Sequence, residues 1–182
     1  IASDFNGTCL AHPYEPAMVG KNVLNVTDSN GVAIKRNMRE IAKRGSGFAY
    51  YIWPNPAQSD AEELKLTYVL KVDEELWLAA GTYLAVKAPI FSNESREDLV
   101  TYVEGARDFA LNTTQEEALS AFNDINGSYV EGNHYIIAYD FTGKCLAHPI
   151  KQEVIGTNRI NVSDPNGIEQ VRDMIALAEN VE

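Results

Sequence analysis

Residues 4–38, DFNGTCLAHPYEPAMVGKNVLNVTDSNGVAIKRNM, decide how this chain is organised, because residues 140–174, DFTGKCLAHPIKQEVIGTNRINVSDPNGIEQVRDM, repeat them without a gap. The two copies agree at 17 of 35 positions, and the run CLAHP is identical in both. A repeat of this length is a domain-sized unit, unlike the short period of a solenoid. The sequence therefore predicts two tandem copies of one small domain.

The two copies lie at different distances from the chain ends. Three residues precede the first copy, and about fifty residues of further strand pattern follow it, whereas the second copy is preceded by a long stretch and ends at Glu182. We expect a first domain over residues 1–92, which lacks its N-terminal helix and part of its first strand. We expect a second domain over residues 93–182, with only its N-terminal helix, hairpin and middle helix. The chain would then be a piece of a longer protein.

The composition is that of a folded, acidic protein. The 182 residues are 45% hydrophobic, which is enough for one or two small cores. Fifteen lysine and arginine residues against 26 aspartate and glutamate residues give a formal net charge of −11. This charge repels phosphate backbones and anionic membrane surfaces, so we expect no nucleic-acid partner. No apolar run approaches the roughly 20 residues that a membrane-spanning helix needs.

Two features bear on the compartment. Cys9 and Cys145 occupy equivalent positions of separate copies, so we expect two buried core residues and no disulfide. Six N-x-S/T triplets occur where about one or two would arise by chance, which is typical of an exported protein, although such pairs are also ordinary turn chemistry. The triplets begin at Asn6, Asn25, Asn93, Asn112, Asn126 and Asn161.

Local patterns predict hairpins and an amphipathic helix. Asn6-Gly7, like Thr142-Gly143 in the second copy, lies between short β-prone runs and predicts a tight hairpin turn. Residues 28–31 form a turn that can cap the helix after it. In that helix, apolar residues recur at i, i+4, i+7 and i+8 from Ile34, and Gly45 ends it.

The residues after this helix predict strands and then a broken helix. Three strands are expected at residues 47–53, 64–72 and 76–86, and their short links imply an antiparallel meander. Residues from about 98 to 124 are predicted to be helical, with capping boxes that begin at Ser95 and Thr114 and a break near Asn112.

The order of the motifs resembles a known family. HP, G-x-N, D-x-N-G, a helix, GFAYYIWPNP, LKLTYVLKV and LWLAAGTYL follow one another. This order is similar to that of the Cache family of extracytoplasmic sensor domains, specifically its single-Cache branch. The resemblance runs from Asp4 to about Leu84 and again from about Ser95 to the end. It implies an α/β (α+β) fold of PAS type, in which helices accompany a central antiparallel sheet.

The aromatic strand is the best candidate for a binding site. Side chains alternate between the two faces of a strand, so Tyr51 and Trp53 share one face, whereas Phe48, Tyr50 and Ile52 take the other. An aromatic wall with a phenol suits a small ligand, because the apolar surface removes water and the hydroxyl orients the bound molecule.

Three further residues are candidate donors. Lys65 can supply charge to a carboxylate, and His12 can donate through its imidazole. Tyr68 is the third candidate, but strict alternation puts Lys65 and Tyr68 on opposite faces unless a bulge intervenes, and we favour Lys65.

Each candidate also has a structural interpretation. Tyr51 and Trp53 would be core residues, Lys65 would face water, and His12 would bond to the backbone of a turn. The resemblance favours binding, because the matching positions of the family commonly hold small organic acids.

Other chemistries have less support in the sequence. The Asp28-x-Asn30-Gly31 turn lacks the spacing of a calcium-binding EF-hand, so an Asx-type turn or a helix cap is preferred. The three histidines form no metal pair, and neither a nucleophile elbow nor a phosphate-binding loop is present. We therefore expect neither catalysis nor a cofactor.

The resemblance implies an extracytoplasmic sensory module of a membrane-anchored receptor or kinase. Its partner would be a small carboxylate of the acetate, pyruvate and lactate class, and binding would transmit a conformational signal. The alternative is a structural or partner-binding tandem module without a small-molecule ligand, whose core at Tyr51 and Trp53 would be filled and dry.

The incomplete second copy leads to an expectation about assembly. Without the three later strands it would leave an open sheet edge. We expect the helix from about residue 98 and a strand at 134–141 to complete the first sheet, within the chain or by exchange in a homodimer, unless the missing strands belong to a longer protein.

Overall fold

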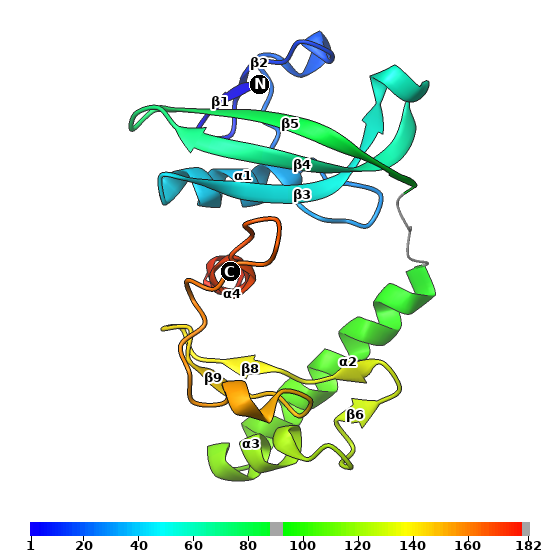
Figure 1. Cartoon of the computed structure of the whole chain (residues 1–182), viewed down its shortest axis with the longest axis vertical. Coiled ribbons are helices and arrows are strands. Elements are labelled where there is room, and N and C mark those ends of the chain that lie inside the picture. Colours follow the sequence, from blue (N-terminus) through cyan, green and yellow to red (C-terminus); the bar gives the residue numbers. More distant parts are fainter. Residues whose placement is uncertain (88–92, 180–182) are drawn as a thin grey trace. The chain divides into compact units, whose positions relative to one another are not determined.

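The structure, a computed structural model, describes residues 1–87 and 93–179. The chain divides into two compact units (Figure 1). Unit 1 comprises Ile1–Ile90, Ser163–Ile168 and Ala176–Glu182, and unit 2 comprises Phe91–Val162 and Glu169–Ile175. The expected boundary between two Cache domains near residue 92 stays a prediction.

Unit 1 contains a five-stranded sheet in the order β2-β1-β5-β4-β3, in which all neighbouring strands are antiparallel. Helix α1 lies against one face of this sheet (Figure 1). The elements are β1 (Ala2–Asp4), β2 (Cys9–Ala11), η1 (Pro16–Met18), α1 (Ile34–Lys43), β3 (Ser46–Asn55), η2 (Pro56–Gln58), β4 (Ala61–Lys71) and β5 (Leu76–Lys87).

The predicted elements of unit 1 are confirmed. The meander of β3, β4 and β5 is antiparallel, and each strand reaches at least one residue beyond its predicted start or end. The hairpin between β1 and β2 turns at Gly7, whose φ of 93° is a conformation that residues with a Cβ rarely adopt. Helix α1 ends before Gly45, which also has a positive φ, of 108°.

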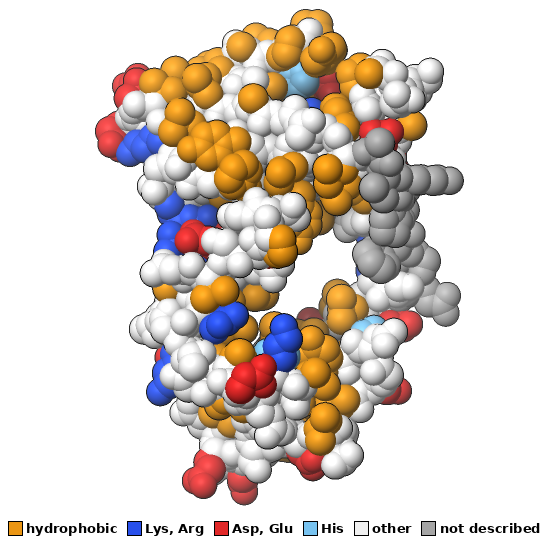
Figure 2. Space-filling model, in the orientation of Figure 1, with side chains coloured by type: hydrophobic (Ala, Val, Ile, Leu, Met, Phe, Trp, Pro, Cys, Tyr) orange, Lys and Arg blue, Asp and Glu red, His pale blue; other side chains and the backbone are white. Residues whose placement is uncertain are grey.

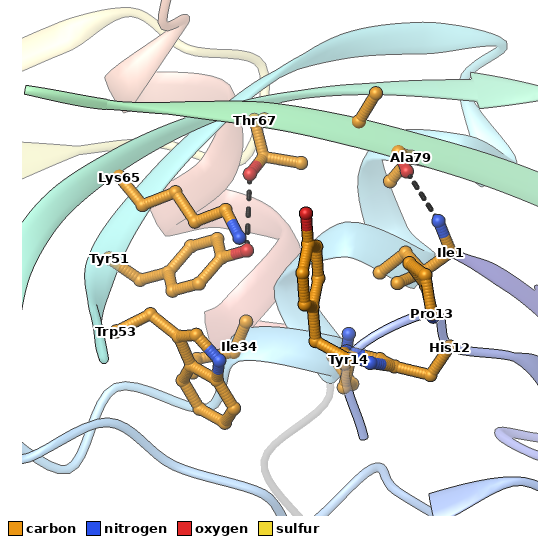
Figure 3. Close-up of a pocket in the computed structure, with 13 residues that line it drawn as sticks. Ile1, His12, Pro13, Tyr14, Ile34, Tyr51, Trp53, Lys65, Thr67 and Ala79 are labelled. Carbon is orange, nitrogen blue, oxygen red and sulfur yellow. Dashed lines mark hydrogen bonds between the residues drawn. The ribbon is translucent and has the colours of Figure 1, made fainter. Parts of the chain in front are cut away.

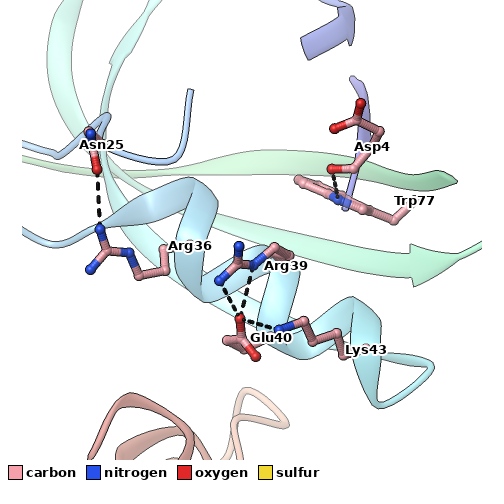
Figure 4. Close-up of polar contacts among 7 residues, drawn as sticks. All are labelled: Asp4, Asn25, Arg36, Arg39, Glu40, Lys43 and Trp77. Atoms are coloured by element: carbon pink, nitrogen blue, oxygen red, sulfur yellow. Dashed lines mark hydrogen bonds and ion pairs between the residues drawn. The ribbon is translucent and has the colours of Figure 1, made fainter. Parts of the chain in front are cut away.

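The core of unit 1 lies between α1 and the covered face of the sheet. Met38, on the apolar stripe of the helix, and Trp77, on β5, are both fully buried. The indole Nε1 of Trp77 donates to the carbonyl oxygen of Asp4 at 3.1 Å, which ties β5 to β1 (Figure 4). On the outer side of α1, Glu40 accepts hydrogen bonds from Arg39 and Lys43 (Figure 4). The helix therefore presents one apolar and one charged face, as its periodicity predicts.

The turn at residues 28–31 differs from its predicted role as a helix cap. Asp28 is buried, and its Oδ1 accepts hydrogen bonds from the backbone of Asn30 and Val32, both at 2.9 Å. The N-cap of α1 is instead Ala33, which makes no side-chain cap bond. The Asx-type turn is thus confirmed, but it does not cap α1.

The other face of the sheet in unit 1 carries partly exposed apolar side chains. Figure 2 shows hydrophobic side chains gathered over this unit. On this face of the sheet, five large side chains are between 40% and 45% exposed: Tyr50, Tyr68, Leu70, Leu78 and Leu84. Phe48 and Tyr68 pair across the strands with ring centroids 5.0 Å apart. The predicted division of aromatic residues between the two faces is therefore confirmed.

Unit 2 contains helices and two small sheets. Helix α2 is followed after a break by α3, whose capping box at Thr114 and Glu117 is present as predicted. Strands pair as β6 with β7 and β8 with β9. The remaining elements of the chain are α2 (Asn93–Asn112), α3 (Gln115–Asn123), β6 (Val130–Glu131), β7 (His134–Tyr135), β8 (Ala138–Tyr139), β9 (Cys145–Ala147), η3 (Gln152–Val154) and α4 (Gln170–Ala178).

Two expectations about residues 93–141 are wrong. Helix α2 begins at Asn93, so Ser95 lies inside the helix and is not its cap. Within the chain, residues 134–141 do not form one strand that completes the first sheet, because they divide into β7 and β8, each of which pairs with its own neighbour. Exchange in a homodimer stays a prediction. The five strands of the large sheet all come from the first 87 residues, and β1 pairs directly with β5.

The cysteines lie where they were predicted. Cys9 and Cys145 are both buried and both free, so each serves as a small core residue.

Within residues 1–87 and 93–179, no helix combines the length and the apolar character that crossing a bilayer requires.

Candidate functional site

A cavity of about 230 Å³ opens in unit 1 between the covered face of the sheet, the start of α1 and the segment after β2. The sheet contributes Tyr51, Trp53, Lys65 and Thr67 to its wall. Figure 3 shows Tyr51, Trp53 and Lys65 on one side, with His12, Pro13 and Tyr14 opposite them. The region predicted to bind a ligand is therefore hollow, whereas the alternative of a structural module requires a filled core.

The strand register brings the polar side chains together. Tyr51 on β3 is directly opposite Lys65 on β4, and Lys65 is opposite Tyr83 on β5. Directly paired residues of antiparallel strands point to the same face, so these side chains gather on the side that α1 covers. The alternation read from the sequence is therefore what assembles the site.

Gly81 leaves room for this group. It pairs with Thr67 across β4 and β5, and it lines the cavity. A Cβ at this position would collide with Thr67 Oγ1 and with the carbonyl oxygen of Leu66, and it would come within 3.0 Å of Lys65 Cε. The absence of a side chain at Gly81 therefore keeps this part of the cavity open.

Tyr51 supplies a buried hydroxyl. Its oxygen lies 3.1 Å from Oγ1 of Thr67 (Figure 3), and only 7% of the residue is exposed. Burial raises the pKa of Tyr51 to about 12, so the phenol stays protonated at physiological pH. Either hydroxyl of the pair can therefore donate to an oxygen atom inside the cavity.

Lys65 supplies a positively charged group held by an aromatic residue. Its ammonium donates to the hydroxyl of Tyr83 at 3.1 Å and lies 4.4 Å from the centre of that ring. The Tyr83 hydroxyl in turn donates to the carbonyl oxygen of Pro54 at 2.7 Å, so its lone pairs face Lys65. Burial lowers the pKa of Lys65, and the nearby carboxylate of Glu15 opposes this shift.

His12 is first a turn residue. Its Nδ1 accepts the backbone N–H of Glu15 at 2.9 Å. Burial and then the charge of Lys35 lower the pKa of His12, which favours the neutral imidazole. With Nδ1 occupied as an acceptor, the proton of the neutral ring resides on Nε2. The histidine that was proposed as a donor therefore has a structural role as well as a place in the cavity wall.

Trp53 is fixed by a hydrogen bond at its polar edge. The indole Nε1 donates to Oε1 of Glu15 at 3.0 Å, and the Trp53 ring meets that of Tyr51 edge-on, with centroids 6.1 Å apart. These contacts hold the apolar ring against the cavity.

Lys35, like Thr67, is a cavity residue that the sequence interpretation missed. It lines the cavity from the second position of α1, and it is only 4% exposed. Burial lowers the pKa of Lys35 to about 8, with a further contribution from the charge of Lys65. Lys35 stands three and seven residues before Met38 and Ala42, so it lies on the buried stripe of the helix. This spacing could have indicated from the sequence that Lys35 is on the buried face of the helix.

The structure brings four of the five predicted residues together. His12, Tyr51, Trp53 and Lys65 all line the cavity. Tyr68 does not, because it lies on the other face of the sheet and packs against Phe48. The strand irregularity in β4 falls between Glu63 and Lys65, so the alternation from Lys65 to Tyr68 is regular. A role in ligand binding stays a prediction for all five residues.

The lining residues suit an anion with a small organic part. The ammonium groups of two lysines, three hydroxyls and an imidazole are hydrogen-bond donors, and Ile34, Pro13 and Trp53 supply apolar surface. Among the described residues, no group of three or more His, Cys, Asp or Glu side chains could hold a metal ion.

Comparison with known proteins gives one match over the full length. The family model of the Cache domain, dCache_2, matches residues 1–182. The sensor histidine kinase MctS of Rhizobium johnstonii is 30% identical over 82 residues, which are 44% of this chain and 18% of the kinase. The chain thus covers less than a fifth of this curated relative.

Solved structures resemble part of the chain. A methyl-accepting chemotaxis protein of Vibrio parahaemolyticus is 30% identical and has a TM-score of 0.43. A second structure, titled for carboxylic acid recognition by a Cache chemosensory domain, is 26% identical, also with a TM-score of 0.43. Each comparison covers 46% of this chain and 57% of the other.

Proposed function

This chain belongs to the Cache domain family, and from that premise we propose that it is a sensory module whose cavity binds a small carboxylate of the acetate, pyruvate and lactate class. One observation carries the proposal: the cavity of about 230 Å³ opens inside the core of unit 1, where Lys65 and Tyr51 meet. A core formed only for stability would fill this space, because voids cost packing energy.

The chemistry of the wall supports a carboxylate. A small anion offers too little apolar area to bind without charge-assisted hydrogen bonds. Lys65 provides the charge, and the hydroxyls of Tyr51 and Thr67 provide neutral donors beside it. The organic part of the ligand would lie against Trp53 and Ile34.

The site is proposed to bind its ligand without converting it. A bound acid would contact α1, the segment after β2 and the central strands at once, and so would bias their packing toward one arrangement. We place the module outside the cytoplasm in a membrane-anchored receptor, in keeping with the relative named as a sensor histidine kinase.

A thermal-shift screen against acetate, pyruvate, lactate and related acids tests the proposal. A ligand at 100 times its dissociation constant stabilises the folded state by about 2.7 kcal/mol, so binding raises the melting temperature. If no acid does so, the alternative of a structural or partner-binding module is favoured.

Calorimetry on variants then places the ligand. Lys65→Met keeps most of the side-chain length and removes the charge, so affinity falls by about 1.5–3 kcal/mol. Lys71→Met is the matched control, because Lys71 is on the same strand and its ammonium pairs with Glu74 at 2.6 Å. Tyr51→Phe removes one donor and also weakens binding. Unchanged affinity in both Lys65→Met and Tyr51→Phe would put the ligand elsewhere.

A further inference from the structure

Lys35 is a buried cation for which no residue that the structure describes is a hydrogen-bond or ion-pair partner. Its side chain enters the cavity from α1 and is 4% exposed, and neither a hydrogen bond nor an ion pair joins its ammonium to any residue within 1–87 and 93–179. Buried ammonium groups normally pair with an anion, because water is lost on burial. A negatively charged ligand in the cavity could pair with the Lys35 ammonium.

The charged groups around Lys35 give a simple balance. Lys65 faces the same cavity from β4 and adds a second positive charge, and His12 is neutral when its pKa lies below the working pH. Glu15 is the nearby carboxylate, but it accepts the indole proton of Trp53 and forms no ion pair with either lysine among the described residues. The α-amino group of Ile1 also lines the cavity and donates to the carbonyl oxygen of Ala79 at 2.9 Å. Among the side chains, two lysines and one glutamate leave one positive charge.

We propose that Lys35 is a second anchor for the ligand's carboxylate, and that Lys35 and Lys65 together select ligands with one negative charge and no ammonium group. This inference rests on the proposed function and refines its ligand class. A carboxylate has two oxygens with about four acceptor positions, so one group can accept from both lysines and from the hydroxyl of Tyr51 or Thr67.

The same balance predicts what the cavity rejects. An α-amino acid brings an ammonium group beside two lysines, and the carboxylate of Glu15 is already engaged by Trp53. A dicarboxylate brings one negative charge more than the wall can compensate. Like charges and unpaired charges in a desolvated site are strongly unfavourable, so both classes bind weakly.

The repeat provides an internal reference for Lys35. Position 171 of the second copy, which aligns with position 35, is a buried valine. An apolar side chain thus suits this point of the module, and a lysine there opposes folding until an anion arrives. Removing the charge should therefore strengthen the ligand-free fold while it weakens binding, a combination that a purely structural lysine would not produce.

Propionate, alanine and succinate form a matched set of probes, because alanine adds an ammonium group to propionate and succinate adds a second carboxylate. Calorimetry on the full chain should show binding of propionate, with alanine and succinate at least tenfold weaker. In Lys35→Met, propionate affinity should fall about 10- to 150-fold, and the melting temperature without ligand should rise. Arg36→Met is the control, because Arg36 is on the same helix, does not line the cavity and bonds to Asn25 (Figure 4).

The outcomes separate this inference from the proposed function. If no monocarboxylate binds the wild type, both fail. If Lys65→Met loses affinity while Lys35→Met and Lys35→Val retain it, the lysine pair is overturned and the carboxylate site stands. If alanine or succinate binds as tightly as propionate, the proposed selectivity is overturned. Lys35→Val introduces the residue found at position 171 of the second copy, and it replaces Lys35→Met in these measurements if Lys35→Met folds poorly.

Discussion

The two copies of the repeat share their backbone and differ at the cavity. In both, a leading aspartate accepts the backbone N–H four residues later, at Thr8 and at Lys144. In both, the histidine Nδ1 accepts the backbone N–H three residues later, as His12 and His148 show. The residues that are identical in the two copies therefore include those that shape the local chain.

The cavity residues are where the copies diverge. His12 and Pro13 are repeated, but four other positions at or beside the cavity change their chemistry. These are Tyr14 and Ile150, Glu15 and Lys151, Ile34 and Gln170, and Lys35 and Val171. Among the repeated positions, the lysine that we assign to ligand binding, Lys35, therefore occurs only in the first copy.

The largest expected effect concerns a residue that the copies share but bury differently. Met38 is fully buried, whereas its counterpart Met174 is 42% exposed. Met38→Ala should cost about 2–5 kcal/mol because it leaves a cavity in a packed core, and Met174→Ala should cost less than about 0.5 kcal/mol. Chemical denaturation followed by far-ultraviolet circular dichroism measures both variants, because Trp53 and Trp77 report on unit 1 alone, whereas Met174 lies in unit 2. Equal losses in the free energy of unfolding would show that Met38 and Met174 contribute equally to stability, which would contradict this prediction.

The second effect is a pH dependence at the position that differs most in charge. The pKa of Lys35 is about 8 in the folded protein, against an ordinary value of 10.5, because the side chain is buried. Below pH 8 the lysine is charged in both states, so burial exerts its full cost on folding. Between about pH 8 and 10.5 the unfolded state binds more protons, so stability rises with pH.

Comparison with Lys35→Val isolates this contribution. The other titrating groups near the site, His12, Glu15 and Lys65, are common to both proteins. The free energy of unfolding of the wild type should approach that of Lys35→Val by about 3 kcal/mol as the pH rises from 8 to 10.5. Denaturant titrations at several pH values measure this difference. A constant difference would mean that Lys35 is hydrated in the folded protein.

The sequence predicted those elements of the fold that local residue patterns specify. Period-two alternation predicted the meander, and a stripe from Ile34 with a stop at Gly45 predicted α1. The pairing of β1 with β5 was not predicted, because it joins residues more than seventy positions apart and no local pattern specifies it. The same limit explains why residues 134–141 were wrongly assigned to the large sheet.

Part of the candidate site could also be predicted from the sequence, because it depends on local patterns. Tyr51, Trp53 and Lys65 were found because alternation fixes their face, and Tyr68 was correctly given second place to Lys65. Lys35 was missed because a lysine near the start of a helix usually faces water. Its place on the apolar stripe and the valine at position 171 were both readable, and alignment of the copies is the signal that would have found it.

The third effect tests the half of the site that the sheet provides. Gly81→Ala should destabilise unit 1 by about 1–3 kcal/mol, because the new methyl group overlaps Thr67 and crowds Lys65. The same change should weaken propionate binding about tenfold or more. Gly105→Ala in α2 is the control, since a Cβ there meets nothing within 4 Å and alanine favours a helix. Unaltered stability in Gly81→Ala would show that Thr67 can move aside.

The smallest effect concerns the paired Asx turns, which differ by one hydrogen bond. Asp28 and Asp164 each accept two backbone N–H groups within their own loops, but Oδ2 of Asp28 also accepts the backbone N–H of Ile52 at 3.1 Å. Asparagine keeps the first acceptor and turns the second into a donor. Asp28→Asn should therefore cost about 1 kcal/mol, and Asp164→Asn less than about 0.5 kcal/mol.

Hydrogen exchange at the amide of Ile52 makes this last test specific. In Asp28→Asn that amide loses its acceptor, so its exchange should accelerate more than that of other amides in β3. The corresponding loop amides in Asp164→Asn should exchange as in the wild type. If the two variants behave alike, the contact between the Asx turn and β3 contributes nothing, and the first copy gains no rigidity from the strand that carries Tyr51 and Trp53.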